Sequence, residues 1–296
     1  MLQYLSTLDR RVVFLLMGLA VAIPILFPLP LSYKPSVLAQ QAFDAIETLP
    51  PGSNVVFSFD YDPAASGELQ PMANALMYHC GQRKHNLYFM ALWAPGAAIC
   101  SDTIDGILLK RCEGYEYGQN YVELGYQAGL AGVIKIAVTD LRQQFKTDKY
   151  GTPLDQIPMM KGIQNLQPMD LLVSVSAGDP GSKEWVQLFV TPFPATKMVT
   201  GTTGVQSVSL YTYIPNQIDG MLGAIKGAAE YETIVNAKYP GPDGKPLPEL
   251  QEGQRRMGPQ LTAHLLMVTL IAVGNVVYFM QRKASRRSGH ARGAAR

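Results

Sequence analysis

Two long apolar runs near the ends of the sequence restrict its possible folds more than any other feature. The first, residues 12–31, begins VVFLLMGLAVAIPILF, and the second, residues 261–280, reads LTAHLLMVTLIAVGNVVYFM. Neither run contains a charged residue, and a helix of about 20 apolar residues is long enough to cross a bilayer. We therefore expect transmembrane helices at 12–32 and 261–280, the first of them kinked at Pro24.

Basic residues flank both runs on the outer side. Arg10 and Arg11 precede the first run, and the second is followed by Arg282, Lys283, Arg286, Arg287, Arg292 and Arg296. Because positively charged flanks stay in the cytoplasm, the sequence predicts cytoplasmic ends at 1–11 and 281–296. The segment between the runs is then periplasmic or extracellular, at the cell (inner) membrane. Arg255 and Arg256 point to the opposite orientation but are outnumbered.

Two alternatives stay open for these runs. The small-residue pattern VLA at 37–39 would fit cleavage of the first run as a signal peptide, although that run is longer than a usual signal core. In the second run, Asn275 could donate a hydrogen bond to a partner helix or bond within its own helix. We expect the lipid bilayer, and a membrane-protein partner or a second copy of the chain, as partners.

The segment between the runs has an ordinary globular composition with a mild acidic excess. Residues 33–259 hold 17 Lys and Arg against 22 Asp and Glu, which gives no basic patch and argues against nucleic-acid binding. Its cysteines, Cys80, Cys100 and Cys112, have no metal-binding spacing. An oxidising compartment would permit one disulfide, but we expect three small buried apolar groups.

Five apolar segments alternate with helical ones between residues 54 and 203. The expected strands are 54–61, 86–93, 121–126, 170–178 and 197–203, and a long helix is expected at 216–237. Because these strands are continuously apolar, both of their faces should be covered, as in a parallel sheet. The sequence predicts an α/β domain at 33–238, a three-layer sandwich with a mainly parallel sheet of about five strands, Rossmann/flavodoxin-like. A Pro/Gly linker at 239–260 follows it.

Polar side chains follow four of the expected strands. In doubly wound folds, ligands bind at the carboxyl ends of the strands. We expect a pocket for a small polar ligand there, with no cofactor, no metal and no assigned catalytic residue. Its predicted lining residues are Asp60, Asp62, Trp93, Ser176, Asp179, Thr202 and Thr203.

The pair Asp60 and Asp62 resembles the opening D-x-D of the haloacid-dehalogenase-like phosphatases, which also follows a buried strand. The resemblance implies that Asp60 is a nucleophile, that Asp62 is an acid/base and that Mg²⁺ binds beside them. The chain departs from that pattern at Pro63 and Ala64, where the family has Thr or Val soon after the second Asp. It also lacks an acidic pair after the fifth strand.

A structural interpretation competes with this resemblance. The segment DYDPAAS after the first strand and AGDPGSKE after the fourth both place Asp-Pro between a strand and a helix. Asp is a common N-cap and Pro fits the first helical turn, so Asp62 and Asp179 are expected to cap helices. Asp60 remains the better functional residue.

The predicted function follows from two features of the sequence: the expected membrane anchors and the absence of known catalytic motifs. The sequence contains no G-x-S-x-G, Walker or G-x-G-x-x-G motif, and the outer domain holds only His79 and His85. We expect a membrane-anchored binding or scaffolding module, either an accessory subunit of a membrane complex or a sensor of a small ligand. The alternative is a metal-assisted hydrolase or phosphoesterase that uses Asp60.

Overall fold

The computed structural model describes residues 9–27 and 34–293. The chain divides into two compact units, Ser32–Gln254 and the pair of terminal segments Met1–Leu31 with Arg255–Arg296. The end of the predicted first span, from residue 28, lies outside the described residues. Each unit has its own packing and is described separately below.

The unit Ser32–Gln254 is built on one six-stranded parallel sheet in the order β3-β2-β1-β4-β5-β6. Its strands are β1 (Asn54–Asp60), β2 (Asn86–Ala91), β3 (Tyr121–Tyr126), β4 (Leu171–Ser176), β5 (Lys197–Thr202) and β6 (Gly220–Gly223). The five predicted strands are confirmed, and the central strands β1 and β4 are buried almost throughout, as strands covered on both faces are. The fold is α/β and Rossmann-like.

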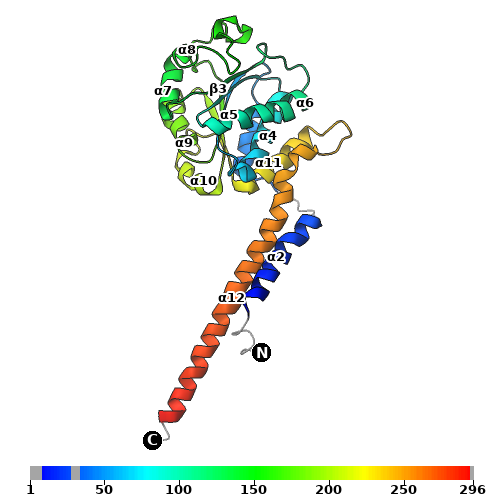
Figure 1. The fold of residues 1–296 in the computed structure, drawn as a ribbon, viewed down its shortest axis with the longest axis vertical. Helices are drawn as coiled ribbons and strands as arrows, with labels where there is room; N and C mark the ends of the chain where they lie inside the picture. The colour runs from blue at the N-terminus through cyan, green and yellow to red at the C-terminus, as the bar shows by residue number, and fades with distance from the viewer. Residues whose placement is uncertain (1–8, 28–33, 294–296) are drawn as a thin grey trace. The chain divides into compact units, whose positions relative to one another are not determined.

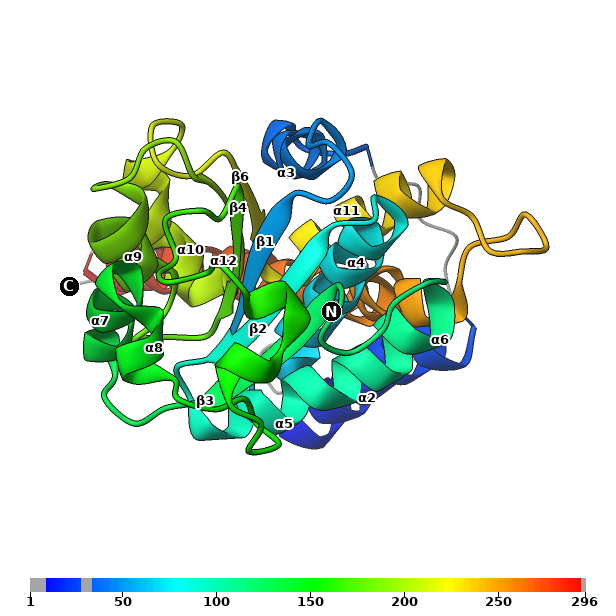
Figure 2. The same ribbon diagram turned by 90° about the horizontal axis from the view of Figure 1, so that it is seen from above.

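Helices cover both faces of the sheet, as Figure 2 shows. On one side lie α3 (Val37–Glu47), α4 (Ser66–Gln82), α5 (Ala94–Thr103), which continues through η1 (Ile104–Leu108) into α6 (Leu109–Arg111), and α11 (Ala224–Lys238). On the other lie α7 (Ala131–Thr139), α8 (Leu141–Gln144), α9 (Ser182–Trp185) with η4 (Val186–Val190), and α10 (Gly204–Leu210) with η5 (Tyr211–Tyr213). Short 3-10 turns, η2 (Leu154–Gln156), η3 (Pro158–Met160) and η6 (Pro248–Leu250), lie in the connecting segments.

The sixth strand corrects the sequence prediction of one long helix at 216–237. Residues Gly220–Gly223 form β6, and the helix α11 begins only at Ala224. Packing requires glycine at position 220, because a Cβ there would lie 2.2 Å from the backbone nitrogen of Ala42 in α3. The first part of the predicted helix is therefore a strand that packs directly against α3.

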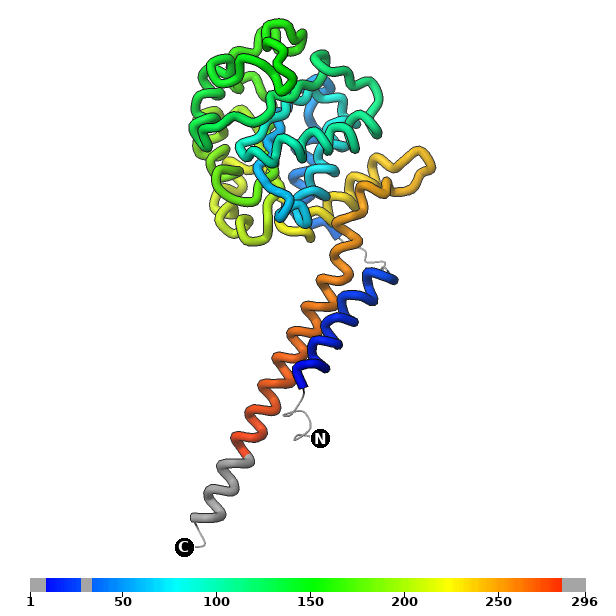
Figure 3. The backbone as a smooth tube through the Cα atoms, viewed as in Figure 1, coloured from blue at the N-terminus to red at the C-terminus, as the bar shows by residue number. Residues whose placement is uncertain are grey.

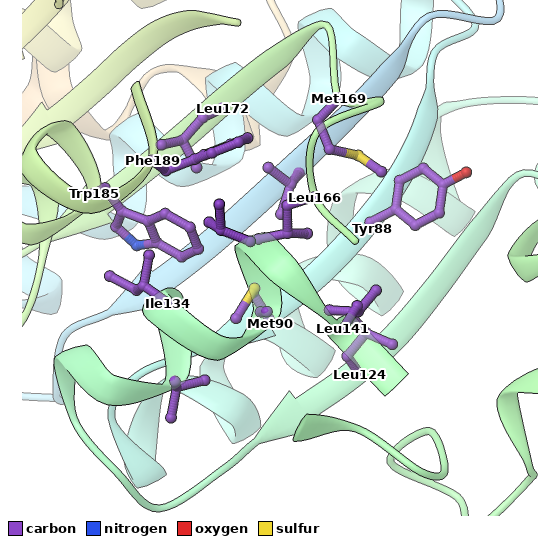
Figure 4. Packing of buried hydrophobic residues seen from close by; sticks show 14 of the residues in the cluster. Tyr88, Met90, Leu124, Ile134, Leu141, Leu166, Met169, Leu172, Trp185 and Phe189 are labelled. Atoms are coloured by element: carbon purple, nitrogen blue, oxygen red, sulfur yellow. The ribbon is translucent and has the colours of Figure 1, made fainter. Parts of the chain in front are cut away.

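One apolar cluster fills the space between the sheet and α7, α9 and η4. Trp185 and Phe189 pack there with Ile134 and Met90, all at or near zero exposure (Figure 4). Burial of each such side chain contributes about 1.5–3 kcal/mol. This cluster fixes the helices that follow β3 and β4, and so the loops at the carboxyl edge of the sheet.

The second unit holds two apolar helices that pack antiparallel. α2 (Arg10–Leu26) lies beside α12 (Glu252–Gly293) in Figure 3. Thr262 Oγ1 donates to the carbonyl of Ala20 at 2.6 Å. One helical turn away, Gly258 lies against Pro24. The residue number thus falls by four on α12 while it rises by four on α2, so the helices are antiparallel. Among the described residues, the segment Glu252–Lys283 is the one helix long and apolar enough to cross a membrane, while α2 is described for 17 residues.

Much of the segment predicted as a Pro/Gly linker, 239–260, has regular structure or packs on the domain. Its last part is helical, because α12 begins at Glu252. Its first part packs on the domain: Leu247 and Leu250 are buried, and the Asn236 side chain in α11 bonds to the backbone of both residues. The part of this segment up to Gln254 is therefore a structured extension of the Ser32–Gln254 unit.

Candidate functional site

The crevice between β1 and β4 is the expected place for a ligand in this fold. Strand order reverses direction at this point, because β2 and β3 continue on one side of β1 and β5 and β6 on the other side of β4. Such switch points hold the ligands of doubly wound sheets, beyond the carboxyl ends of the strands. Asp60 ends β1 here, in register with Ser176 at the end of β4.

Asp60 is fully buried and surrounded by hydrogen-bond donors. Its carboxylate accepts from the Leu92 backbone N–H at 2.8 Å, from the indole of Trp185 at 3.1 Å and from the Ser58 hydroxyl at 2.7 and 2.8 Å. Burial raises the pKa of Asp60 to about 7, and the bonds from Leu92, Ser58 and Trp185 oppose that rise. Trp185 thus occupies the place next to Asp60 that an incoming group would need.

A network of hydroxyl and amide groups closes the neighbouring strand ends. Ser176 and Thr202 are fully buried, and both of their hydroxyls donate to Gln206 Oε1 at 3.0 Å. Gln206 in turn donates to the carbonyl of Gly178 at 2.9 Å. The Thr203 hydroxyl caps α10 by accepting from the Gln206 backbone N–H. These polar groups are satisfied within the protein.

The outer rim holds the remaining predicted residues. The Trp93 indole donates to the Pro180 carbonyl at 2.8 Å and its ring lies against Gly178. Asp62 accepts from the Ala65 backbone N–H at 3.1 Å in the turn before α4, whose N-cap is Ala65. Asp62 therefore supports the turn just ahead of the cap position.

The prediction that Asp179 caps a helix is wrong. α9 begins at Ser182 with Gly181 as its N-cap, and the Glu184 carboxylate accepts from the Gly181 backbone N–H at 2.8 Å. Asp179 is exposed in the preceding loop. Glu184 was the available sequence feature, because an acidic residue three positions after the N-cap can accept from the N-cap backbone N–H, as it does in a capping box.

The structure brings the seven predicted residues to one edge of the sheet but gives them different environments. Asp60, Ser176 and Thr202 lie in the interior, whereas Asp62, Trp93, Asp179 and Thr203 lie nearer the surface. Within 9–27 and 34–293 no three His, Cys, Asp or Glu side chains are grouped closely enough to hold a metal ion. A ligand role for these residues stays a prediction.

A groove that sequence reasoning missed lies between α4 and the α5–η1 helix. It has a volume of about 490 Å³, in the range of small-molecule sites. Along one wall Gln70 donates to Asn74 and to Thr103, each at 2.8 Å, and accepts from the buried Tyr61 hydroxyl at 3.1 Å. The groove is lined by Pro63, Ser66, Gln70, Asn74, Ile99, Asp102, Thr103, Gly106, Ile107, Lys110 and Glu249. The spacing of Gln70 and Asn74 by one helical turn was the available sequence feature.

A buried carboxylate within the edge strand β3 was also missed. Glu123 accepts from the Ser101 hydroxyl at 2.6 Å, from the Tyr150 hydroxyl at 2.7 Å and from the Lys149 ammonium at 3.2 Å. The ion pair with Lys149 offsets the cost of burying this charge. The cluster fastens α5 and the 148–152 loop to the edge strand.

Of the two domain histidines, His79 belongs to a buried structural network. Its ring lies 2.7 Å from the Tyr231 hydroxyl and 3.0 Å from the Glu47 carboxylate, which joins α4 to α11 and α3. Burial lowers the pKa of His79 to about 4, against the opposing influence of Glu47. The network therefore holds a neutral imidazole.

No protein-family model matches the sequence, and neither a curated protein nor a solved structure matches it.

Proposed function

We propose that this protein is a two-span membrane protein whose α/β domain acts outside the cytoplasm as a binding or scaffolding module. The observation that carries the proposal is the antiparallel pair α2 and α12, whose outer surfaces are apolar and exposed. Phe14 and Leu15 on α2, and Val268, Ile271 and Phe279 on α12, each expose more than half of their surface. Exposed apolar surface of this extent marks a lipid or protein interface.

The antiparallel packing supports a hairpin through the bilayer. It points the α2 end that carries Arg10 and Arg11 in the same direction as the α12 end that carries Arg282 and Lys283, although the pairing of Thr262 with Ala20 sets Arg10 level with residue 272, about 15 Å short of Arg282. Basic residues at one end of a helical hairpin favour that end in the cytoplasm. The domain between the helices then lies on the other side of the membrane.

The environment of Asp60 argues against its use as a catalytic nucleophile. A nucleophilic carboxylate has to reach the substrate, whereas Asp60 is fully buried and faces Trp185 and the Leu92 backbone. We assign Asp60 the role of fastening β1 to the segments that follow β2 and β4. A small polar ligand would instead use the groove between α4 and α5–η1, where Asn74, Asp102 and Lys110 line an open cavity.

Purification of the full chain in a mild detergent, followed by light scattering, tests the scaffolding role. We expect a defined complex, either with a membrane partner or with a second copy, rather than a monomer. Asn275→Leu removes the polar side chain that would bond across helices and should weaken the complex, while Asn275→Gln should retain it. A monodisperse monomer for the unaltered chain would contradict the proposal.

A further inference from the structure

The helix α10 exposes an apolar stripe where globular proteins usually present polar groups. Val205 is 90% exposed, Val208 is 70% exposed and Tyr211 is 55% exposed. These positions are three residues apart, so they lie along one face of α10 and η5. The inward positions Ser207 and Leu210 are buried, so the outward face is the more apolar one.

The segment around this stripe carries no charge. Residues 198–218 read MVTGTTGVQSVSLYTYIPNQI, without Asp, Glu, Lys or Arg. A face intended for water usually carries charged residues opposite its buried side. Aliphatic residues together with tyrosine, whose ring is apolar and whose hydroxyl is polar, are instead typical of the boundary between lipid and water.

Both chain segments that lead to the apolar helices are fastened to α11. On the N-terminal side, Ser36 bonds to the buried Glu230 carboxylate, through its hydroxyl at 2.5 Å and its backbone N–H at 3.2 Å. On the C-terminal side, the backbone N–H groups of Gly253 and Gln254 donate to the buried Glu232 carboxylate at 2.9 and 3.0 Å. The two attachment points are thus two residues apart on one helix.

The start of α11 lies directly against α10. A Cβ at Gly204 would be 3.2 Å from the Ala224 side chain, and one at Gly223 would be 3.4 Å from Ser207. In Figure 1, α10 lies at the end of the domain away from α8. The exposed stripe therefore belongs to the region of the domain from which both segments leave.

Short connections limit how far this region can be from the bilayer. The chain between residue 31 and Ser36 can span at most about 18 Å. From Gln254 to the apolar run at residue 261, the helix rises only about 10 Å. The headgroup layer on each side of a bilayer is about 5–8 Å thick, so the shorter, C-terminal connection keeps Gln254 within about 10 Å of the start of the apolar run.

We propose that the α10–η5 face, with Val205, Val208 and Tyr211, rests on the lipid surface of the membrane that holds the helices. This inference rests on the proposed two-span anchoring. Contact with lipid would limit the rocking of the domain and present the opposite end, around α8, to other molecules. Since the segment is uncharged, the contact should not require anionic lipid.

A fluorophore on Val208→Cys tests the contact, in the full chain placed as single copies in phosphatidylcholine nanodiscs. The native cysteines are buried, so the introduced thiol is the one expected to react. Gln143→Cys on the exposed surface of α8 is the matched control. We expect nitroxide lipids labelled near the headgroup to quench the Val208→Cys label at least twofold more than the control label, with or without anionic lipid.

Equal quenching at the two sites in assembled nanodiscs would overturn the lipid contact and leave the anchoring intact. Protection of the Val208→Cys label only when two copies share one disc would also overturn it, in favour of a protein contact. A chain that is recovered outside the discs would instead refute the proposed anchoring itself. The three results are therefore distinguishable in one preparation.

Discussion

Replacement of Asp60 by Asn should change how the stability of the domain depends on pH. Burial raises the pKa of Asp60 from 3.8 to about 7. Between these values the folded chain holds a proton that the unfolded chain has released, so the free energy of unfolding falls as the pH rises. Each pH unit in this interval lowers the free energy of unfolding by about 1.4 kcal/mol, so the whole interval lowers it by about 4 kcal/mol.

Asp60→Asn abolishes this titration, because the amide binds no proton in this range. The substitution also places an amide N–H among the donors Leu92 and Trp185, which costs stability by an amount independent of pH. We therefore expect the free energy of unfolding of the variant, minus that of the unaltered chain, to rise by about 4 kcal/mol between pH 4 and pH 8. Its absolute stability at one pH does not test the argument.

The buried histidines His79 and His85 make the free energy of unfolding depend on pH in the opposite direction, and the comparison of the variant with the unaltered chain removes their contribution. Burial lowers the pKa of both His79 and His85 to about 4. Below about pH 6.5 these histidines bind protons in the unfolded chain but not in the folded chain, so the free energy of unfolding falls as the pH is lowered. Both variants carry this slope, and it cancels in their difference.

Urea unfolding of the full chain in detergent, at several pH values, measures the effect. The two tryptophans, Trp93 and Trp185, both lie at the strand-end rim and report its loss by fluorescence. Asp62→Asn is the matched control two residues away. A difference between Asp60→Asn and the unaltered chain that stays constant from pH 4 to pH 8 would refute the reasoning.

Three further outcomes are expected. Gly220→Ala should lower the free energy of unfolding by about 1–3 kcal/mol in thermal unfolding, because its Cβ meets the Ala42 backbone. The control Gly106→Ala, whose Cβ would have no atom within 4 Å, should change it by less than about 1 kcal/mol, and equal effects of the two variants would contradict the packing. Burial raises the pKa of Cys112 to about 11 and also raises the pKa values of Cys80 and Cys100. None of these thiols should therefore react with a thiol reagent at pH 8 until the chain unfolds, and a fast reaction of the folded chain would be inconsistent with the fold. Glu232→Ala should speed amide exchange at Gly253 and Gln254, and unchanged exchange would argue against the capping role.

Strand positions were predictable because both faces of the sheet are covered. The continuous apolar runs that end at Asp60 and Ser176 had no other suitable environment. β6 was missed for the opposite reason: its four residues include Gly220 and Gly223, and its burial is supplied by α3, far away in sequence. A short glycine-containing segment shows no apolar run of its own.

The candidate site was predictable in position and not in detail. The topological rule places Asp60 at the crevice, but the bond from Trp185 comes from 125 residues away. The same holds for Gln206, which connects the strand ends through Ser176 and Thr202. Such side-chain partners depend on tertiary packing and leave no periodic pattern in the sequence.

Labelling of intact cells with a membrane-impermeant thiol reagent tests the two-span topology most directly. Gln143→Cys places a thiol on the exposed surface of the domain, and Ser288→Cys places one in the basic C-terminal segment. We predict that Gln143→Cys reacts in intact cells and that Ser288→Cys reacts only after permeabilisation. Reaction of Ser288→Cys with protection of Gln143→Cys would contradict the account.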